Sequence, residues 1–315
     1  MCFFVPYWKH CILNLTMWMT RNIIYWILAL FITLSSAMYQ RTTGPTYPVD
    51  GQAEVGEVTV FYTLTRSHGG AGDQPVYVRT ERDGMADGTI VYRRYKTDDP
   101  WTRLPLEARG DSLIGWLPHQ PPAGKLEYFI ELDGGDELLR IPDHETVVTR
   151  FKGAVPSGVL IPHVIFMFLA MLFSTRTGIE ALRRHGRPRM YVFITTGLLI
   201  VGGLILGPIV QKFAFGEYWT GFPFGTDLTD NKTLIAFIAW LIAIAAVWNK
   251  STLTEHPGRR WVVLGAAVVM MLVYLIPHSM MGSELDYEEL DRQRLEQQQS
   301  IPDSAGDTAV IRQIP

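Results

Sequence analysis

The sequence predicts a membrane protein with about five transmembrane helices and one all-β sandwich domain, placed between the first two helices. Two observations lead to this prediction. Five long stretches are nearly free of charged residues, and a polar block, residues 40–152, separates the first stretch from the other four. Within the polar block, short runs rich in β-branched and aromatic residues alternate with Gly, Pro and Asp, which is typical of antiparallel β domains.

The composition agrees with a chain divided between two environments. Of its 315 residues, 48% are hydrophobic and only 19% are charged, whereas soluble proteins carry about 25% charged residues. The formal net charge of −3 supplies no basic face, which excludes the usual electrostatic basis of nucleic-acid binding. Cys2 and Cys11 are the only cysteines, so the polar block has no disulfide and no cysteine-based metal site.

The apolar stretches define the expected domains, because a helix needs about 20 apolar residues to cross a bilayer. Residues 1–22 are expected to form a cytoplasmic N-terminus, and translation from Met17 or Met19 would make its first part a gene-model artefact. A transmembrane helix or signal anchor is expected at 23–39, followed by a linker at 40–53 and a sandwich at 54–152. A four-helix membrane domain is expected at 153–283, with helices near 157–175, 190–210, 232–249 and 261–280. An acidic, disordered extracytoplasmic tail is expected at 284–315.

The distribution of Lys and Arg predicts the orientation of these helices. Arginines, among them Arg176, gather between the second and third stretches, and Lys250, Arg259 and Arg260 lie between the fourth and fifth. We therefore expect both connections in the cytoplasm, and the sandwich and C-terminus outside it, as in a protein of the bacterial inner membrane. Ser35-Ser36-Ala37 resembles a cleavage region, so a removed signal peptide is the alternative to the uncleaved anchor that we favour.

Six runs in the polar block have the composition of strands. They are Val58–Thr65, Val76–Thr80, Thr89–Lys96, Ser112–Leu117, Lys125–Leu132 and Thr146–Phe151. Tyr92-Arg93-Arg94-Tyr95, Trp101, Leu117-Pro118 and the run from Pro122 to Ile130 follow one another in an order that resembles bacterial immunoglobulin-like and fibronectin-III-like domains. The resemblance implies a fold class and a role as a spacer or interaction module, and no activity.

A repeated tetrapeptide supplies the candidate ligand site. Leu-Ile-Pro-His occurs at residues 160–163 and again at 275–278, so His163 and His278 are both expected near the outer membrane face. Ionisable residues in membrane helices often have a function. Facing imidazoles are suited to hold haem b as axial ligands, whereas His163 and His278 with Met167 are suited to copper. A carboxylate such as Asp227 shifts the preference towards zinc.

The alternative interpretation of these residues is structural. A histidine near the headgroups reaches water with its polar edge, and methionines at helical spacing pack against neighbouring helices. Gly203 and Gly207 form a small-xxx-small pair, which is typical of helix contacts in membranes.

No set of residues predicts catalysis. Gly110-Asp111-Ser112-Leu113 matches the first motif of the GDSL hydrolases, but no Asp-x-x-His follows, and a serine without a base is a poor nucleophile. We therefore expect a non-enzymatic membrane subunit or interaction protein that docks an extracytoplasmic or membrane protein partner. The alternative is a haem- or metal-binding protein of electron transfer or metal handling.

Overall fold

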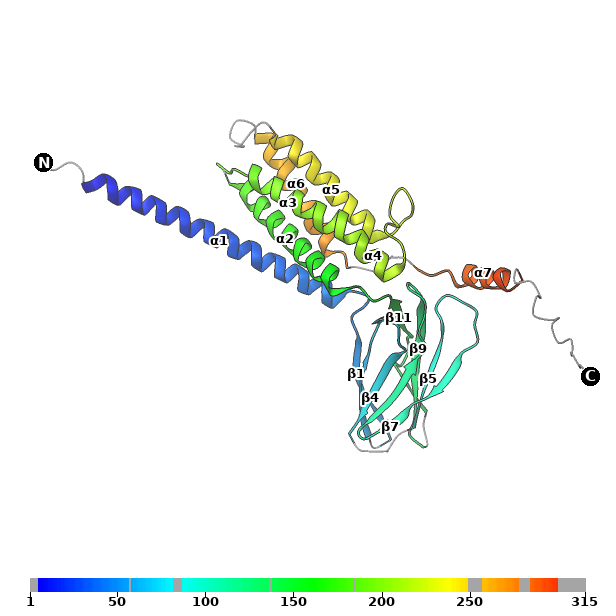
Figure 1. Cartoon of the computed structure of the whole chain (residues 1–315). Helices are drawn as coiled ribbons and strands as arrows, with labels where there is room; N and C mark the ends of the chain where they lie inside the picture. Colours follow the sequence, from blue (N-terminus) through cyan, green and yellow to red (C-terminus); the bar gives the residue numbers. More distant parts are fainter. Residues whose placement is uncertain are drawn as a thin grey trace, which may run out of the picture. The chain divides into compact units, whose positions relative to one another are not determined.

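The computed structural model describes residues 5–56, 58–81, 87–135, 138–183, 185–248, 257–277 and 284–299 (Figure 1). The chain forms two compact units. The helical unit comprises Met1–Asp50, Thr63–Gly72 and Lys152–Ser283, and the β unit comprises Gly51–Tyr62, Asp73–Phe151 and Glu284–Pro315.

The helical unit contains six α-helices and one π-helix among the described residues. They are α1 (Val5–Thr43), α2 (Ser157–Leu182), α3 (Arg189–Leu199), the π-helix η1 (Ile200–Leu206), α4 (Gly207–Phe215), α5 (Leu228–Val247) and α6 (Pro257–Leu275). Five segments are long and apolar enough to cross a membrane: Met19–Thr43, Ser157–Leu182, Arg189–Phe215, Leu228–Val247 and Gly258–Leu275. The predicted number of membrane helices is therefore confirmed, and these segments indicate an integral membrane protein.

The helix ends differ from the expected ones in ways that matter for the site. Helix α2 continues to Leu182, beyond the expected end at residue 175, so Arg176 lies inside this helix. Helix α6 ends at Leu275, before the expected residue 280, and Pro277 follows with no N–H to continue the helix. Helix α1 extends to Thr43 and the first strand begins at Val49, so the expected linker at 40–53 is mostly regular structure.

The core of the helical unit lies where α2, α3, α5 and α6 pack side by side (Figure 1). Trp240, Met171 and Leu199 are fully buried there, and Ala170, Ala243 and Ala267 allow the helix backbones to approach. Helix α1 packs on α2 and α6.

Two β-sheets that pack against each other make up most of the β unit. The first has the order β1 (Val49–Val55), β2 (Val58–Leu64), β4 (Gln74–Thr80), β8 (Ser112–Leu117) and β7 (Glu107–Arg109). The second has the order β3 (Ser67–Gly69), β11 (Val147–Lys152), β9 (Lys125–Asp133), β5 (Asp87–Arg94) and β6 (Thr102–Pro105), with β10 (Leu138–Ile141) also paired to β9.

Alternation along the strands explains which side chains form this core. In β4, Val76 and Val78 are buried whereas Tyr77 and Arg79 are exposed, as the two-residue period of a strand requires. At Gly115 an added Cβ would lie 2.6 Å from Cδ1 of Ile90 in the other sheet, so the sheets approach closely there. The six predicted strands are present, and five further strands that the sequence did not indicate complete the sheets.

The first part of the expected disordered tail is helical. Helix α7 spans Tyr287–Gln299, and Tyr287 at its start is buried in the β unit. Residues 300–315 lie outside the described residues.

Candidate functional site

His163 lies in the second turn of α2, and its contact is with the π-helix. Its Nδ1 atom is 2.9 Å from the carbonyl oxygen of Gly202, which also accepts from the N–H of Gly207 across a π-turn. A carbonyl only accepts, so Nδ1 carries the proton and the neutral ring keeps its lone pair on Nε2. This is the tautomer that a ligating histidine commonly has when a backbone carbonyl orients it.

Met167 follows His163 by one helical turn and lies over the glycines of η1. A Cβ added at Gly202 would be 3.1 Å from Met167 Sδ and 2.9 Å from Phe166 Cβ, and one at Gly203 would be 2.9 Å from Cγ2 of Thr233. The small residues therefore let α2 and η1 approach, and the thioether fills the space above them. Gly202 makes the closer approach to α2, whereas the sequence pattern indicated Gly203 and Gly207 as the pair of small residues at a helix contact.

The other expected ligands are not brought together with His163 by any described contact. His278 lies outside the described residues, so the predicted pair of imidazoles stays a prediction. Asp227 is the N-cap of α5, where its side chain accepts from the N–H of Thr229 at 2.7 Å. Within the described parts of the chain, no three His, Cys, Asp or Glu side chains form a metal-binding group.

The start of α5 carries a buried polar cluster that the sequence did not predict. Asp230 accepts hydrogen bonds from Nε2 of Gln211 at 3.1 Å and from the N–H of Thr220 at 2.6 Å. Lys232, also buried, donates to the carbonyl of Ile276 at 2.9 Å, and Gln40 of α1 donates to that of Tyr274 at 2.8 Å. These two carbonyls lie at the C-terminal end of α6, where carbonyls lack partners within the helix, so Lys232 and Gln40 cap α6.

A second buried polar cluster joins α1 to α2. Arg176 is 1% exposed and donates to Glu180 at 2.7 Å and to the amide oxygen of Asn22 at 2.9 Å. Its guanidinium also lies 4.8 Å from the ring centre of Tyr191. Glu180 also pairs with Arg183 at 2.9 Å. The spacing along α2 explains both pairs of Glu180, whereas no pattern in the sequence indicates Asn22 or Tyr191 as partners of Arg176.

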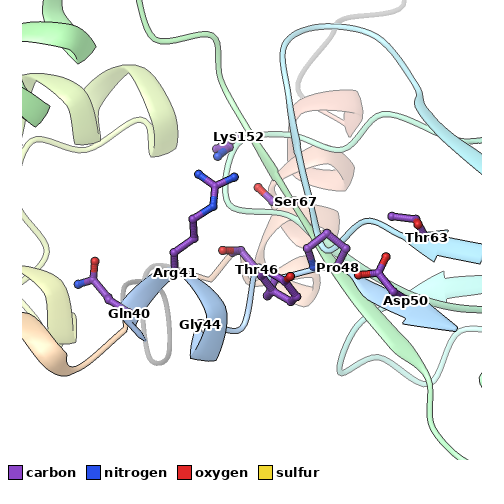
Figure 2. Close-up of a pocket in the computed structure, with 10 residues that line it drawn as sticks. Gln40, Arg41, Gly44, Thr46, Pro48, Asp50, Thr63, Ser67 and Lys152 are labelled. Carbon is purple, nitrogen blue, oxygen red and sulfur yellow. The ribbon is translucent and has the colours of Figure 1, made fainter. Parts of the chain in front are cut away.

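The helical unit also has an open pocket of about 590 Å³ beside the end of α1 (Figure 2). Its lining is mostly polar and consists of Gln40, Arg41, Gly44, Thr46, Tyr47, Pro48, Asp50, Thr63, Ser67 and Lys152. In Figure 2 the side chain of Arg41 extends towards Lys152, near Ser67, whereas Asp50 lies at the far end beyond Pro48.

The β unit has one outward face rich in aromatic side chains. Phe61 lies opposite Arg79, Tyr77 lies opposite Ile114, and Trp116 follows Ile114 by two residues on the same face. We call these five residues the aromatic face. Tyr77 is 52% and Trp116 36% exposed, and the guanidinium of Arg79 stacks 5.5 Å from the ring centre of Phe61.

The tail segment is fixed to the β unit by polar contacts. Glu284 pairs with Lys96 at 2.9 Å and with Lys125 at 3.1 Å. The hydroxyl of Tyr287 accepts from the N–H of Lys125 at 2.9 Å, and burial raises the pKa of Tyr287 to about 12. Arg94 pairs with Asp291 at 2.7 Å. Burial would raise the pKa of Glu284, but hydrogen bonds from the two lysines outweigh burial and lower it.

Ser112 does not have the environment of a nucleophile. It lies in β8, and its hydroxyl donates to the carboxylate of the adjacent Asp111 at 3.0 Å. No described histidine lies within hydrogen-bonding distance of this hydroxyl.

Comparison of the chain with known protein families and with curated protein sequences finds no match.

Proposed function

We propose that the chain is a non-enzymatic integral membrane subunit whose β unit docks a protein partner outside the cytoplasm. The aromatic face is the observation that carries this proposal. Tyr, Trp and Arg are enriched at the centres of protein interfaces, whereas Lys, Glu and Asp are depleted there. Tyr77, Trp116 and Arg79 place these residue types side by side on a sheet, which is a rigid support.

The opposite outward face of the β unit provides a contrast. There, Arg93 pairs with Glu127 at 2.6 Å, Arg103 pairs with Glu131, and Trp101 packs on Phe129. The charges of Arg93 and Arg103 are therefore matched within the domain. We infer that the fold of the unit is an immunoglobulin-like sandwich, as the two packed sheets and the resemblance of residues 92–130 support.

The orientation follows from charge and connectivity. Arg183, Arg184 and Arg187 lie between the second and third spans, and the positive-inside rule assigns this connection to the cytoplasm. Four spans separate Lys152 from Glu284, so both residues are on the same side of the membrane. The contacts of the tail with the β unit agree with this assignment. We propose the bacterial inner membrane as the location, with the β unit outside the cytoplasm.

Purification of the full chain from native membranes tests the docking proposal. The expected result is a second protein that co-purifies in stoichiometric amount and is lost from the Tyr77→Glu/Trp116→Ala variant. Trp101→Ala is the matched control, because Trp101 is exposed to a similar degree, 39% against 36% for Trp116, but lies on the opposite face. A wild-type chain that purifies without any second protein contradicts the proposal.

A second candidate function is haem or copper binding by His163. The observation that favours it is the hydrogen bond from Nδ1 to Gly202, which leaves Nε2 as the ligating atom. An absorption spectrum of the detergent-purified protein, oxidised and then reduced, together with elemental analysis, tests it. Retained haem or copper that His163→Ala and His278→Ala each abolish supports this function, and equal content in wild type and both variants contradicts it.

A further inference from the structure

The pocket beside α1 combines two cations with hydroxyl groups. Arg41 and Lys152 both line the pocket, with the side chain of Arg41 extending towards Lys152, and Ser67 and Thr46 line it as well (Figure 2). Within the described part of the chain, Arg41 takes part in no ion pair. A guanidinium with free donors beside a lysine and hydroxyls is a combination that binds phosphate oxygens.

The membrane spans next to Arg41 and Lys152 indicate the source of such a phosphate. Arg41 is in the last turn of the first span, Met19–Thr43, and Lys152 precedes the second span, Ser157–Leu182, by five residues. Two consecutive spans end and begin at the same membrane surface when the segment between them does not cross. Both cations therefore lie at the depth of the lipid headgroups, where phosphodiesters are abundant.

We propose that this pocket binds the headgroup of a phospholipid, with the phosphodiester on Arg41 and Lys152. Its volume of about 590 Å³ is that of a small-molecule site. The pocket has opposite charges at its two ends, because Asp50 lies away from the cations (Figure 2). A carboxylate there repels a second negative charge and attracts an ammonium group, so the preferred headgroup is zwitterionic and carries an amine.

Native mass spectrometry of the full-length protein in detergent tests this proposal, with phosphatidylethanolamine and phosphatidylglycerol titrated separately. We expect tighter binding of phosphatidylethanolamine and a loss of about tenfold or more in its affinity in Arg41→Gln/Lys152→Gln. Arg41→Lys/Lys152→Arg keeps both charges and should retain most of the affinity. Lys212→Gln is the matched control, since Lys212 is in the last turn of another span that ends at the same surface and lies outside the pocket.

Three outcomes would contradict the proposal, and each concerns a different part of it: the binding site, the lipid as ligand, or the role of Asp50. Equal affinity in wild type and Arg41→Gln/Lys152→Gln, with both proteins eluting as folded species, excludes the pocket as the binding site. Displacement of the lipid by millimolar inorganic phosphate assigns the pocket to a free anion. Phosphatidylglycerol bound as tightly as phosphatidylethanolamine, with no change in Asp50→Asn, contradicts the role of Asp50.

Discussion

The amide oxygen of Asn22 in α1 accepts a hydrogen bond of 2.9 Å from the guanidinium of Arg176 in α2. Arg176 is almost completely buried, so each of its partners offsets part of the cost of removing its charge from water. Glu180 supplies the opposite charge from the same helix, whereas Asn22 is the partner that comes from α1. This contact makes the first helix part of the bundle.

Asn22→Ala should lower the free energy of unfolding by about 1.5–3 kcal/mol, because it removes a hydrogen bond from a buried charge. Arg176→Met should lower the free energy of unfolding by about 3–5 kcal/mol, because it removes a cation that balances the buried negative charge of Glu180. Arg183→Ala is the control, because the Arg183 side chain is 29% exposed and should contribute less than about 1 kcal/mol. Thermal unfolding in detergent measures all three, and equal effects of Asn22→Ala and Arg183→Ala would refute the ranking.

The same contacts predict that the first helix stays attached to the protein. Ser35, Ser36 and Ala37 lie inside α1, and the Ser36 hydroxyl is 3.3 Å from Met271 Sδ of α6. A peptidase needs its substrate extended, and cleavage here would remove Asn22 from Arg176. The intact mass of the purified protein should therefore include Trp26, which packs on Phe173 with 5.1 Å between ring centres. A mature N-terminus at Met38 would contradict this.

Gly202→Ala should separate α2 from η1. The new Cβ would lie 2.9 Å from Phe166 Cβ and 3.1 Å from the Met167 nitrogen, and backbone atoms cannot move aside cheaply. We expect a loss of about 1–3 kcal/mol, as for other overpacked contacts. Gly197→Ala is the matched control, because nothing lies within 4 Å of its added Cβ. Thermal unfolding measures the stability of both variants. An equal loss in Gly202→Ala and Gly197→Ala would contradict a close contact between Gly202 and α2.

The contact of the tail with the β unit should depend on pH. The pKa of Glu284 is lower in the folded chain than its ordinary value of 4.5, because its bonds to Lys96 and Lys125 outweigh burial. Its stabilising contribution is therefore complete above pH 4.5 and is lost as the pH falls through the lower folded value.

Hydrogen exchange of residues 284–299 between pH 3 and 7, corrected for intrinsic rates, measures this dependence. Protection of the wild-type tail should fall below pH 4.5, and Glu284→Gln should give weaker protection with a smaller change over the same range. A tail whose protection changes equally in both proteins would contradict the role of Glu284.

The membrane helices and the principal strands were predictable from sequence because they depend on local composition. Apolar runs such as 190–210 are long enough to identify by themselves, and Val76–Thr80 alternates clearly. The short strands β3 and β7 were missed, since three residues such as Ser67–Gly69 carry too little pattern and are specified by their neighbours in the sheet.

The polar contacts were predictable only where they are local. Glu180 and Arg176 are four residues apart on one helix, so their pairing follows from helical spacing. Arg94 and Asp291 are separated by 197 positions, and nothing in either segment indicates the other. The repeated tetrapeptide singles out His163 as a candidate ligand, and that role stays a prediction. Its hydrogen bond to Gly202 was not predictable, because it depends on the π-helix, which has no sequence signature here.

Photo-cross-linking in native membranes tests the docking role of the aromatic face most directly. A photoreactive amino acid in place of Tyr77 should form one discrete protein adduct, because Tyr77 is at the centre of the proposed interface. The same group in place of Trp101 should form none. No adduct from position 77, or equal adducts from both positions, would contradict the central claim.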